Sequence, residues 1–474
     1  MTRRWMLAVL VSLLVAGCAS SATPSPSSSA AASPAVAASS SAASPAAAPA
    51  SPAGSADPAS IGRAFIEALS RADWAGAVAM EDPVMAAAAP AGTLQQIIAS
   101  LVAQYGAFES IGSVTTAPVS TGTIAAVQVA LAHATVTLNV SVDGSGRVTG
   151  LHIGGVTTAT ASPASYVRPG SYTESAVTVG SAPWTLPGTL TMPNGPGPFP
   201  AVVLVAGSGP ADRNESFGPN KPFQDLAWGL ASAGIAVLRY EKRTYVYAKQ
   251  MAADTTITVK QETMDDAVAA VALLRRTPKV DPARVFLVGH SLGAYLAPRI
   301  AAEIPGQLAG IAMLEAPSTP LPQLVVIQEE YLASLQGGSP SPQVEQQLAT
   351  LKRQAALAES PSLSPSTPAS ELPLGTPASY WLDLQSYRPL AVAASLTIPI
   401  FFSQGGRDYQ VPPSELGPWE QALAGHANVT FRTYPAMDHL LLDGSGTPSP
   451  AEYSVPGHVD AQLVANLSAW VTAH

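Results

Sequence analysis

From about residue 165 to the end of the chain, short apolar runs alternate with amphipathic segments. This alternation restricts the possible folds more than any other feature. The runs PFPAVVLVAG, IAVLRYE, RVFLV and IAMLEAP have the length and composition of buried strands, and helical segments separate most of them. Strands connected through helices pair in parallel, because the connection has to cross the sheet. We therefore predict a mostly parallel central sheet flanked by helices over residues 165–474, opened by a β-hairpin in SAVTVGSAPWTLPGTLTMP.

The alternation is interrupted once, between residues 318 and 390. This stretch contains two polar-faced helical segments and a part rich in Pro and Ser, after which the strand-like runs IPIFFSQGGRD and VTFRTYPAMDH resume. A segment of this length between two strands predicts a helical insertion into the sheet domain.

Residues 58–160 predict a separate, small α+β domain. Two helical segments come first, with apolar residues at helical spacing in ASIGRAFIEALSRAD and TLQQIIASLVAQYG, and three strand-like runs follow. This order resembles the NTF2-like/cystatin-like domains found before hydrolases in bacterial secreted proteins. His133 and His152 lie on predicted strands, and we interpret them as structural.

The first 57 residues predict export. Residues 1–18 contain two arginines, a short apolar run and the sequence LVAGC, and they resemble a bacterial lipoprotein signal in which Cys18 carries the lipid. The alternative is an ordinary secretory signal that contains a cysteine. Residues 19–57 are almost only Ala, Ser, Pro, Thr and Val, a composition typical of a disordered tether. We expect an extracytoplasmic protein anchored to the cell membrane.

The overall composition excludes several other classes. The net charge of -9 provides no basic surface, so nucleic acid is not an expected partner. Cys18 is the only cysteine, which excludes an intrachain disulfide framework and a cysteine-based zinc site. The oligomeric state is left open.

Residues 289–293 read GHSLG and match the G-x-S-x-G pattern. The match follows the apolar strand RVFLV and opens an amphipathic helix, which is the setting of a nucleophile elbow. We predict that Ser291 is a nucleophile; the alternative is a serine that only forms a turn.

A nucleophilic serine requires a base and an acid that orients the base. His439 directly follows the last predicted strand, and Asp408 follows the strand before it. These positions reproduce the chain order Ser, acid, His. The alternatives are a histidine in a surface loop and an aspartate that caps the next helix.

Five segments together resemble the α/β-hydrolase superfamily: VLVAGSGPADRNE, LRYEKR, VFLVGHSLGAYLAP, IFFSQGGRDYQV and YPAMDHLL. They are most similar to bacterial serine esterases with a GSGP-x-DR oxyanion loop. The resemblance also implies that the helical insertion at about residues 318–390 is a cap, because this superfamily has its cap at that place. Two positions depart from the usual pattern of these esterases: Ala206-Gly207 stands in place of His-Gly, and Glu241-Lys242-Arg243 in place of Asp-Lys-Arg.

The resemblance implies a two-step acyl transfer by Ser291, His439 and Asp408, with the N–H groups of Ser208 and Leu292 in the oxyanion hole. It implies no metal or organic cofactor. We expect small soluble esters as substrates. A serine peptidase or peptidyl transferase acting near the cell wall, and a catalytically silent binding lipoprotein, are the alternatives.

Side chains around this predicted site allow more than one use. Tyr380 and Trp381 of the insertion are candidates for lining an acyl pocket, or they pack the insertion onto the sheet domain. Asp212 and Arg213 are expected to pair and brace the glycine turn. Arg213 or Arg243 could instead bind a substrate carboxylate.

Overall fold

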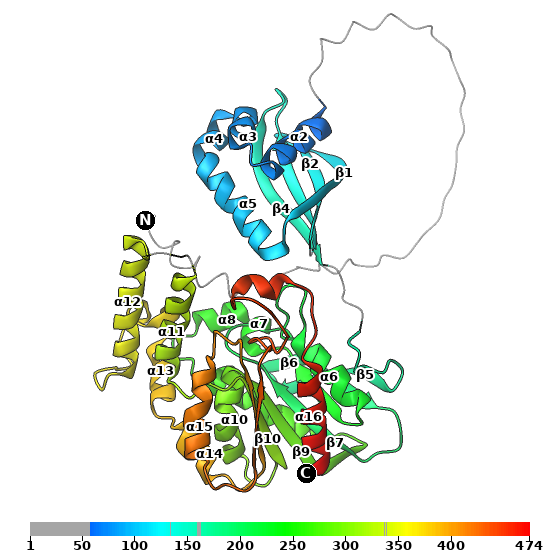
Figure 1. Cartoon of the computed structure of the whole chain (residues 1–474), viewed down its shortest axis with the longest axis vertical. Helices are drawn as coiled ribbons and strands as arrows, with labels where there is room; N and C mark the ends of the chain where they lie inside the picture. Colours follow the sequence, from blue (N-terminus) through cyan, green and yellow to red (C-terminus); the bar gives the residue numbers. More distant parts are fainter. Residues whose placement is uncertain (1–56, 133, 159–162, 336, 338) are drawn as a thin grey trace, which may run out of the picture. The chain divides into compact units, whose positions relative to one another are not determined.

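The computed structural model describes residues 57–132, 134–158, 163–335, 337 and 339–474 (Figure 1). The predicted lipoprotein signal with Cys18, almost all of the predicted tether, and His133 lie outside these ranges. Within them, no helix combines the length and the apolar character needed to span a bilayer. The chain divides into two compact units, with the boundary between residues 157 and 158.

The smaller unit places helices before a four-stranded meander. The helix α2 packs against β1, β2 and β3, and it buries the apolar residues predicted to face a core, Ile61, Phe65, Ile66 and Leu69. The sheet order is β1-β2-β3-β4. The elements are α2 (Pro58–Ser70), α3 (Trp74–Met80), α4 (Pro83–Ala88), α5 (Ala91–Tyr105), β1 (Phe108–Val119), β2 (Gly122–Leu131), β3 (Ala134–Val142) and β4 (Val148–Thr158).

The larger unit contains an eight-stranded sheet in the order β12-β11-β10-β9-β7-β8-β6-β5. The strands β12 to β8 of this order pair in parallel, whereas β5, β6 and β8 pair antiparallel. The strands are β5 (Tyr172–Ser181), β6 (Trp184–Pro193), β7 (Phe199–Val205), β8 (Ala236–Tyr240), β9 (Val280–His290), β10 (Gly310–Leu314), β11 (Ile400–Gly405) and β12 (Val429–Tyr434). The predicted hairpin and the predicted, mostly parallel α/β sheet are confirmed.

Helices cover both faces of this sheet (Figure 1). Along β7, Val202 and Leu204 face a core shared with α6 (Pro222–Ser232) and α16 (Ala461–Ala473), while Ala201, Val203 and Val205 face a core shared with α9 (Asp265–Leu274), α10 (Leu292–Glu303) and α15 (Leu416–Ala422). Alternate residues of a strand point to opposite faces, so a strand buried on both faces is apolar throughout. The remaining helical segments outside the insertion are α7 (Arg243–Val246), α8 (Ala248–Ala253), the π-helix η1 (Lys260–Met264), η4 (Pro413–Glu415) and η5 (Pro450–Ser454).

The insertion lies between β10 and β11, which are neighbours in the sheet. Its helices α11 and α12 pack against each other, and α13 packs against α12. Its elements are α11 (Leu321–Ser334), α12 (Pro342–Glu359), η2 (Ala369–Glu371), η3 (Pro373–Gly375), α13 (Ala378–Gln385) and α14 (Pro389–Ser395). Because β7, β9, β10, β11 and β12 are parallel, the loops that follow them gather at one edge of the sheet.

Candidate active site

Ser291 stands alone between the end of β9 and the start of α10. Its φ of 52° is unusual for a residue with a side chain and is typical of a sharp strand-to-helix turn. A Cβ on Gly289 would lie 2.3 Å from the Gly293 carbonyl oxygen, and a Cβ on Gly293 would lie 2.2 Å from that of Val205. Both glycines are therefore required for the turn to pack closely against itself and against β7.

Asp408 and His439 meet in the loops after β11 and β12. The distance between His439 Nδ1 and Asp408 Oδ2 is 2.7 Å, and both side chains are buried. The other carboxylate oxygen of Asp408 accepts hydrogen bonds of 2.8 Å from the N–H groups of Gln410 and Val411. The carboxylate is thus fixed by the backbone, and it holds a proton on Nδ1, which leaves Nε2 of His439 free to accept a proton.

The serine turn and the histidine loop are joined through His290. Its Nε2 lies 2.8 Å from the His439 carbonyl oxygen, and the two imidazole rings are 4.8 Å apart. Ser291 Oγ forms no hydrogen bond within the described part of the chain. Hydrogen bonds between a nucleophile and its base are often long without substrate and shorten when substrate binds.

His290 itself points toward Glu215, whose Oε1 is 3.1 Å from His290 Nδ1. Burial disfavours the charged imidazole, but the Glu215 carboxylate and the His439 carbonyl outweigh burial and raise the pKa of His290 above its ordinary value. His290 therefore has a structural role: it joins the serine turn to Glu215 and to the loop of His439.

The predicted oxyanion loop lies against the serine turn. A Cβ on Gly207 would be 3.1 Å from Ser291 Cβ, so a larger residue at this position would crowd the serine turn. The next N–H, that of Ser208, and the N–H of Leu292 at the start of α10 have no hydrogen-bond acceptor among the described residues. The first N–H groups of a helix lack intrahelical acceptors, so an anion can bind there.

The charged residues in and near this loop have partners other than those predicted. Arg213 binds Glu241 at 2.6 Å instead of pairing with Asp212, so the predicted Asp212–Arg213 brace is wrong. The Asp212 carboxylate instead accepts hydrogen bonds from the N–H groups of Asn214 and Ser216. Arg243 forms a buried ion pair with Asp266 at 2.6 Å. Both arginines considered for binding a substrate carboxylate are therefore engaged in pairs within the chain.

Residues 220–444 match the family described as serine aminopeptidase, S33, and residues 63–151 match the family described as protein of unknown function (DUF3887). The chain is 40% identical over 332 residues to esterase EstD of Thermotoga maritima, which covers 70% of this chain and 75% of that esterase. This chain belongs to the α/β-hydrolase family. Two similar solved structures are Est1E from Butyrivibrio proteoclasticus and a hyperthermophilic esterase from Pyrobaculum calidifontis. Each is 15% identical, with TM-scores of 0.40 and 0.41. They cover 63% and 64% of this chain, and 99% and 85% of their own chains.

In this α/β-hydrolase, sequence reasoning missed an acid next to the predicted triad. Glu315 follows β10 and is fully buried, and its carboxyl group accepts hydrogen bonds from Gly405 N–H at 2.8 Å and from the Gln404 amide at 3.1 Å. Burial, together with the nearby charge of Asp408, raises the pKa of Glu315 well above its usual range. A charged residue directly after the apolar run IAML was the signal in the sequence.

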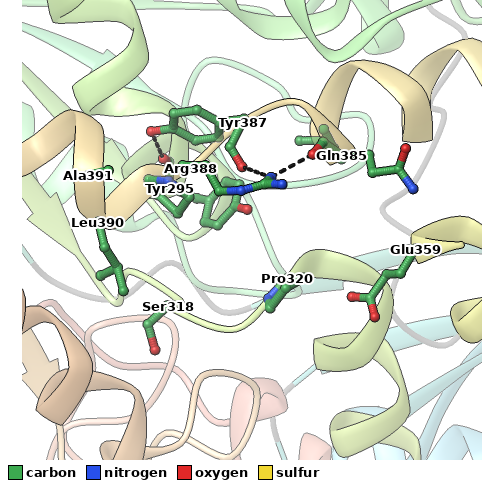
Figure 2. A pocket seen from close by; sticks show the side chains of 11 residues that line it. Tyr295, Ser318, Pro320, Glu359, Gln385, Tyr387, Arg388, Leu390 and Ala391 are labelled. Atoms are coloured by element: carbon green, nitrogen blue, oxygen red, sulfur yellow. Dashed lines mark hydrogen bonds between the residues drawn. The ribbon is translucent and has the colours of Figure 1, made fainter. Parts of the chain in front are cut away.

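The structure supports the packing interpretation of Tyr380 and Trp381. Both lie on α13 and are buried in the core between the insertion and the sheet, and the Tyr380 hydroxyl donates to Glu262 Oε2 at 2.7 Å. They do not line the cavity of about 470 Å³ at this α/β-hydrolase's insertion, which is shown in Figure 2. That cavity is lined by Tyr295, Ser318, Pro320, Glu359, Leu384, Gln385, Tyr387, Arg388, Pro389, Leu390 and Ala391.

The cavity has few charged groups. Arg388 donates to the carbonyl oxygens of Gln385 and Tyr387, and the Tyr387 hydroxyl donates to the Tyr295 carbonyl, as the dashed lines in Figure 2 mark. Tyr295 is one helical turn from Ser291 on α10, so the cavity lies beside the helix that carries the serine. In the described ranges, no cluster of His, Cys, Asp or Glu has the arrangement needed to hold a metal ion.

Proposed function

We propose that this chain is a serine hydrolase that cleaves small soluble carboxylic esters, with Ser291 as nucleophile, His439 as base and Asp408 as the orienting acid. The observation that carries the proposal is the buried 2.7 Å contact between His439 Nδ1 and Asp408 Oδ2, formed at the same sheet edge as the strained turn of Ser291. The identity to an esterase over most of that protein's length supports the same reaction class.

The first half-reaction forms an acyl-enzyme. His439 Nε2 takes the hydroxyl proton of Ser291 as Oγ attacks the ester carbonyl, and the carbonyl oxygen becomes an oxyanion. The N–H groups of Ser208 and Leu292 donate to this oxyanion. Loss of one such donor typically costs about 3–4 kcal/mol of transition-state stabilisation. His439 then returns the proton to the departing alcohol oxygen as the C–O bond breaks.

The second half-reaction releases the acid. His439 takes a proton from water, the hydroxyl attacks the acyl carbon, and the proton returns to Ser291 Oγ when the serine ester breaks. The charged imidazole that forms in each step is stabilised by the Asp408 carboxylate. Because backbone N–H groups bind one oxygen of Asp408, the carboxylate does not have to reorient during turnover.

The test is a series of p-nitrophenyl esters from acetate to palmitate, assayed with the wild type and with Ser291→Ala. We expect the highest kcat/KM on the acetate or butyrate ester, and a fall of at least about 10³-fold in Ser291→Ala. A fluorophosphonate probe should label the wild type and not the variant. Ester turnover that survives Ser291→Ala would contradict the assignment of the nucleophile.

Peptidase activity is a second candidate, because residues 220–444 match a family described as serine aminopeptidases. The same triad chemistry cleaves amides when the leaving amine receives its proton from the base. Aminoacyl p-nitroanilides assayed beside the esters distinguish the two activities. A larger kcat/KM on an anilide than on every ester would favour the peptidase.

We also propose that the chain is a lipoprotein anchored outside the cytoplasm through Cys18. The support is the charged start, the short apolar run and the sole cysteine of the sequence at the end of that run. Two or three acyl chains on the same residue would anchor the protein stably to the membrane. Metabolic labelling with an azido-palmitate should mark the wild-type chain and not Cys18→Ser. Equal labelling of both chains would refute the anchor.

A further inference from the structure

The segment after β8 makes four polar contacts with the predicted oxyanion loop. Residues 241–244 follow β8 directly, and the loop follows β7, the strand beside it. The four contacts are Glu241 with Arg213 at 2.6 Å, Lys242 N–H with the Ala211 carbonyl at 2.9 Å, Lys242 Nζ with the Gly207 carbonyl at 2.7 Å, and Thr244 Oγ1 with the Gly209 carbonyl at 3.3 Å.

The contact of Lys242 is unusual because the ammonium group is buried. Lys242 is 4% exposed, and its Nζ also lies 2.7 Å from Glu262 Oε1. Glu262 is equally buried, lies in the π-helix η1, and accepts a hydrogen bond from Tyr380 of the insertion. An ion pair withdrawn from water rarely stabilises a fold more than apolar residues of the same size. Stability alone therefore does not explain a charged pair at this place.

Both the N–H and the carbonyl group of Gly207 form hydrogen bonds with charged side chains. Its N–H donates to Glu215 Oε1 at 2.6 Å, and its carbonyl accepts from Lys242 Nζ at 2.7 Å. In a trans peptide the carbonyl and the following N–H point in opposite directions. An ammonium group that fixes the Gly207 carbonyl on one side therefore turns the Ser208 N–H toward the other.

The Ser208 N–H lacks a hydrogen-bond acceptor in the described ranges, and a Cβ on the adjacent Gly207 would come within 3.1 Å of Ser291 Cβ. A substrate oxyanion would provide the missing acceptor. We propose that Lys242 is a positioning residue: its ammonium group holds the Gly207–Ser208 peptide so that the Ser208 N–H, together with that of Leu292, points at the oxyanion. This inference rests on the proposed esterase function, and it assigns the donor of the loop to Ser208 and not to Gly209.

The test compares two removals of Lys242 with a matched removal nearby, all in the full chain. Lys242→Met removes the ammonium group and keeps the length of the side chain. Lys242→Met with Glu262→Gln removes the whole buried pair, so no unpaired charge remains even if the single variant does not fold. Arg243→Met with Asp266→Asn is the control, because it removes an equally buried ion pair whose two partners both lie outside the loop.

Four quantities are measured for each chain: kcat and KM on p-nitrophenyl acetate, the inhibition constant of an alkyl trifluoromethyl ketone, and the melting temperature. The ketone forms an oxyanion when the serine attacks it, so its binding reports on the oxyanion hole. We expect both Lys242 variants to lower kcat by about 10- to 100-fold with KM nearly unchanged. The inhibition constant of the ketone should rise by a similar factor. The control should keep kcat and ketone binding within about threefold of the wild type.

The outcomes distinguish a failure of the proposed esterase function from a failure of the inference about Lys242. If the wild type has no ester turnover and no fluorophosphonate labelling, the proposed function is overturned, and this inference with it. If the wild type is active and the folded Lys242 variants keep its kcat, only the inference is overturned. A loss of kcat in the control as large as in the Lys242 variants also overturns it, because the effect would then follow from any buried pair in this region.

Discussion

At the scale of single residues, the site depends on buried charged groups whose partners are far away in the sequence. Lys242, Glu262 and Glu315 are each less than a tenth exposed, and each has polar partners. Buried charges require such partners, because an ionised group in an apolar interior is otherwise neutralised or destabilises the fold. Where the partners are few, the pKa of the group moves, and stability becomes dependent on pH.

Asp438, next to the predicted catalytic histidine, provides such a pH dependence. Burial raises its pKa to about 7, although its Oδ1 accepts hydrogen bonds from the N–H groups of Leu440 and Leu442. The folded state binds the proton more tightly than the unfolded state does. The stability contribution is therefore fully present below about pH 4 and is lost as the pH rises through 7.

We therefore expect Asp438→Asn, which keeps the accepting oxygen and removes the charge, to gain stability relative to the wild type as the pH rises. The gain in free energy of unfolding should be small at pH 5 and reach about 1–3 kcal/mol at pH 8. Urea denaturation of both chains at the two pH values measures it. An equal difference at pH 5 and pH 8 would show that Asp438 titrates normally.

At the scale of elements, the ends of β10 and β11 are tied together by one side chain. The Glu315 carboxyl group accepts from the Gly405 N–H and from the Gln404 amide, both at the end of β11, three to four residues before Asp408. Burial, followed by the nearby charge of Asp408, raises the pKa of Glu315 well above its usual range.

We expect Glu315→Gln to keep these hydrogen bonds and to leave stability and kcat near the wild-type values at pH 7. Glu315→Ala leaves the buried donors unsatisfied, which should cost about 1–3 kcal/mol and lower kcat. Urea denaturation and ester turnover of both variants provide the measurement. If Glu315→Gln were as damaging as Glu315→Ala, Glu315 would act as an ionised carboxylate.

Most elements were predictable because their signals are local. The apolar run before GHSLG, and the loops after the last two strands, placed Ser291, Asp408 and His439 at the ends of β9, β11 and β12. The helix α9 is preceded by the π-helix η1, and Glu262 of η1 forms the ion pair with Lys242. A π-turn is a local irregularity common at functional sites, and no pattern of apolar spacing indicates it.

The side chains that contact the site could not be predicted, because they are far apart in the sequence and local patterns do not connect them. Lys242 contacts Gly207, 35 residues before it, and Tyr380 contacts Glu262 across 118 residues. A local sequence pattern does not indicate which residues at such separations come into contact. Tyr380 and Trp381 were assigned to a pocket or to packing on residue type alone, and aromatic side chains serve both uses equally well. Only the fold brought them into the core.

At the scale of the whole molecule, each of the two units has its own hydrophobic core. In the smaller unit, Phe65, Ile66 and Leu69 pack with apolar residues of its own sheet. In the larger unit, the cores on the two faces of the sheet include residues from β7 to α16, and Tyr166 packs against one of them. A unit with a complete core can fold without its neighbour.

We expect a chain of residues 163–474 to fold and to keep kcat on p-nitrophenyl acetate within about twofold of the full chain. Circular dichroism, thermal unfolding and ester assays of both chains provide the measurement. A fragment that is folded but inactive would mean that residues 58–157 take part in catalysis. A fragment that does not fold would mean that the larger unit depends on the smaller one for stability.

The insertion leaves the sheet at β10 and returns to it at β11, and these two strands are hydrogen-bonded neighbours. Because the two strands are parallel, the connection leaves at the carboxyl end of β10 and has to return to the amino end of β11. Such a crossover takes about a dozen residues or more. The insertion is much longer than such a crossover requires, and the extra length includes α11 and α12, which pack on each other. Glu359 of α12 lines the cavity beside α10. Changes in these two helices can therefore reshape the cavity while every strand pair at the edge that carries Ser291 is kept.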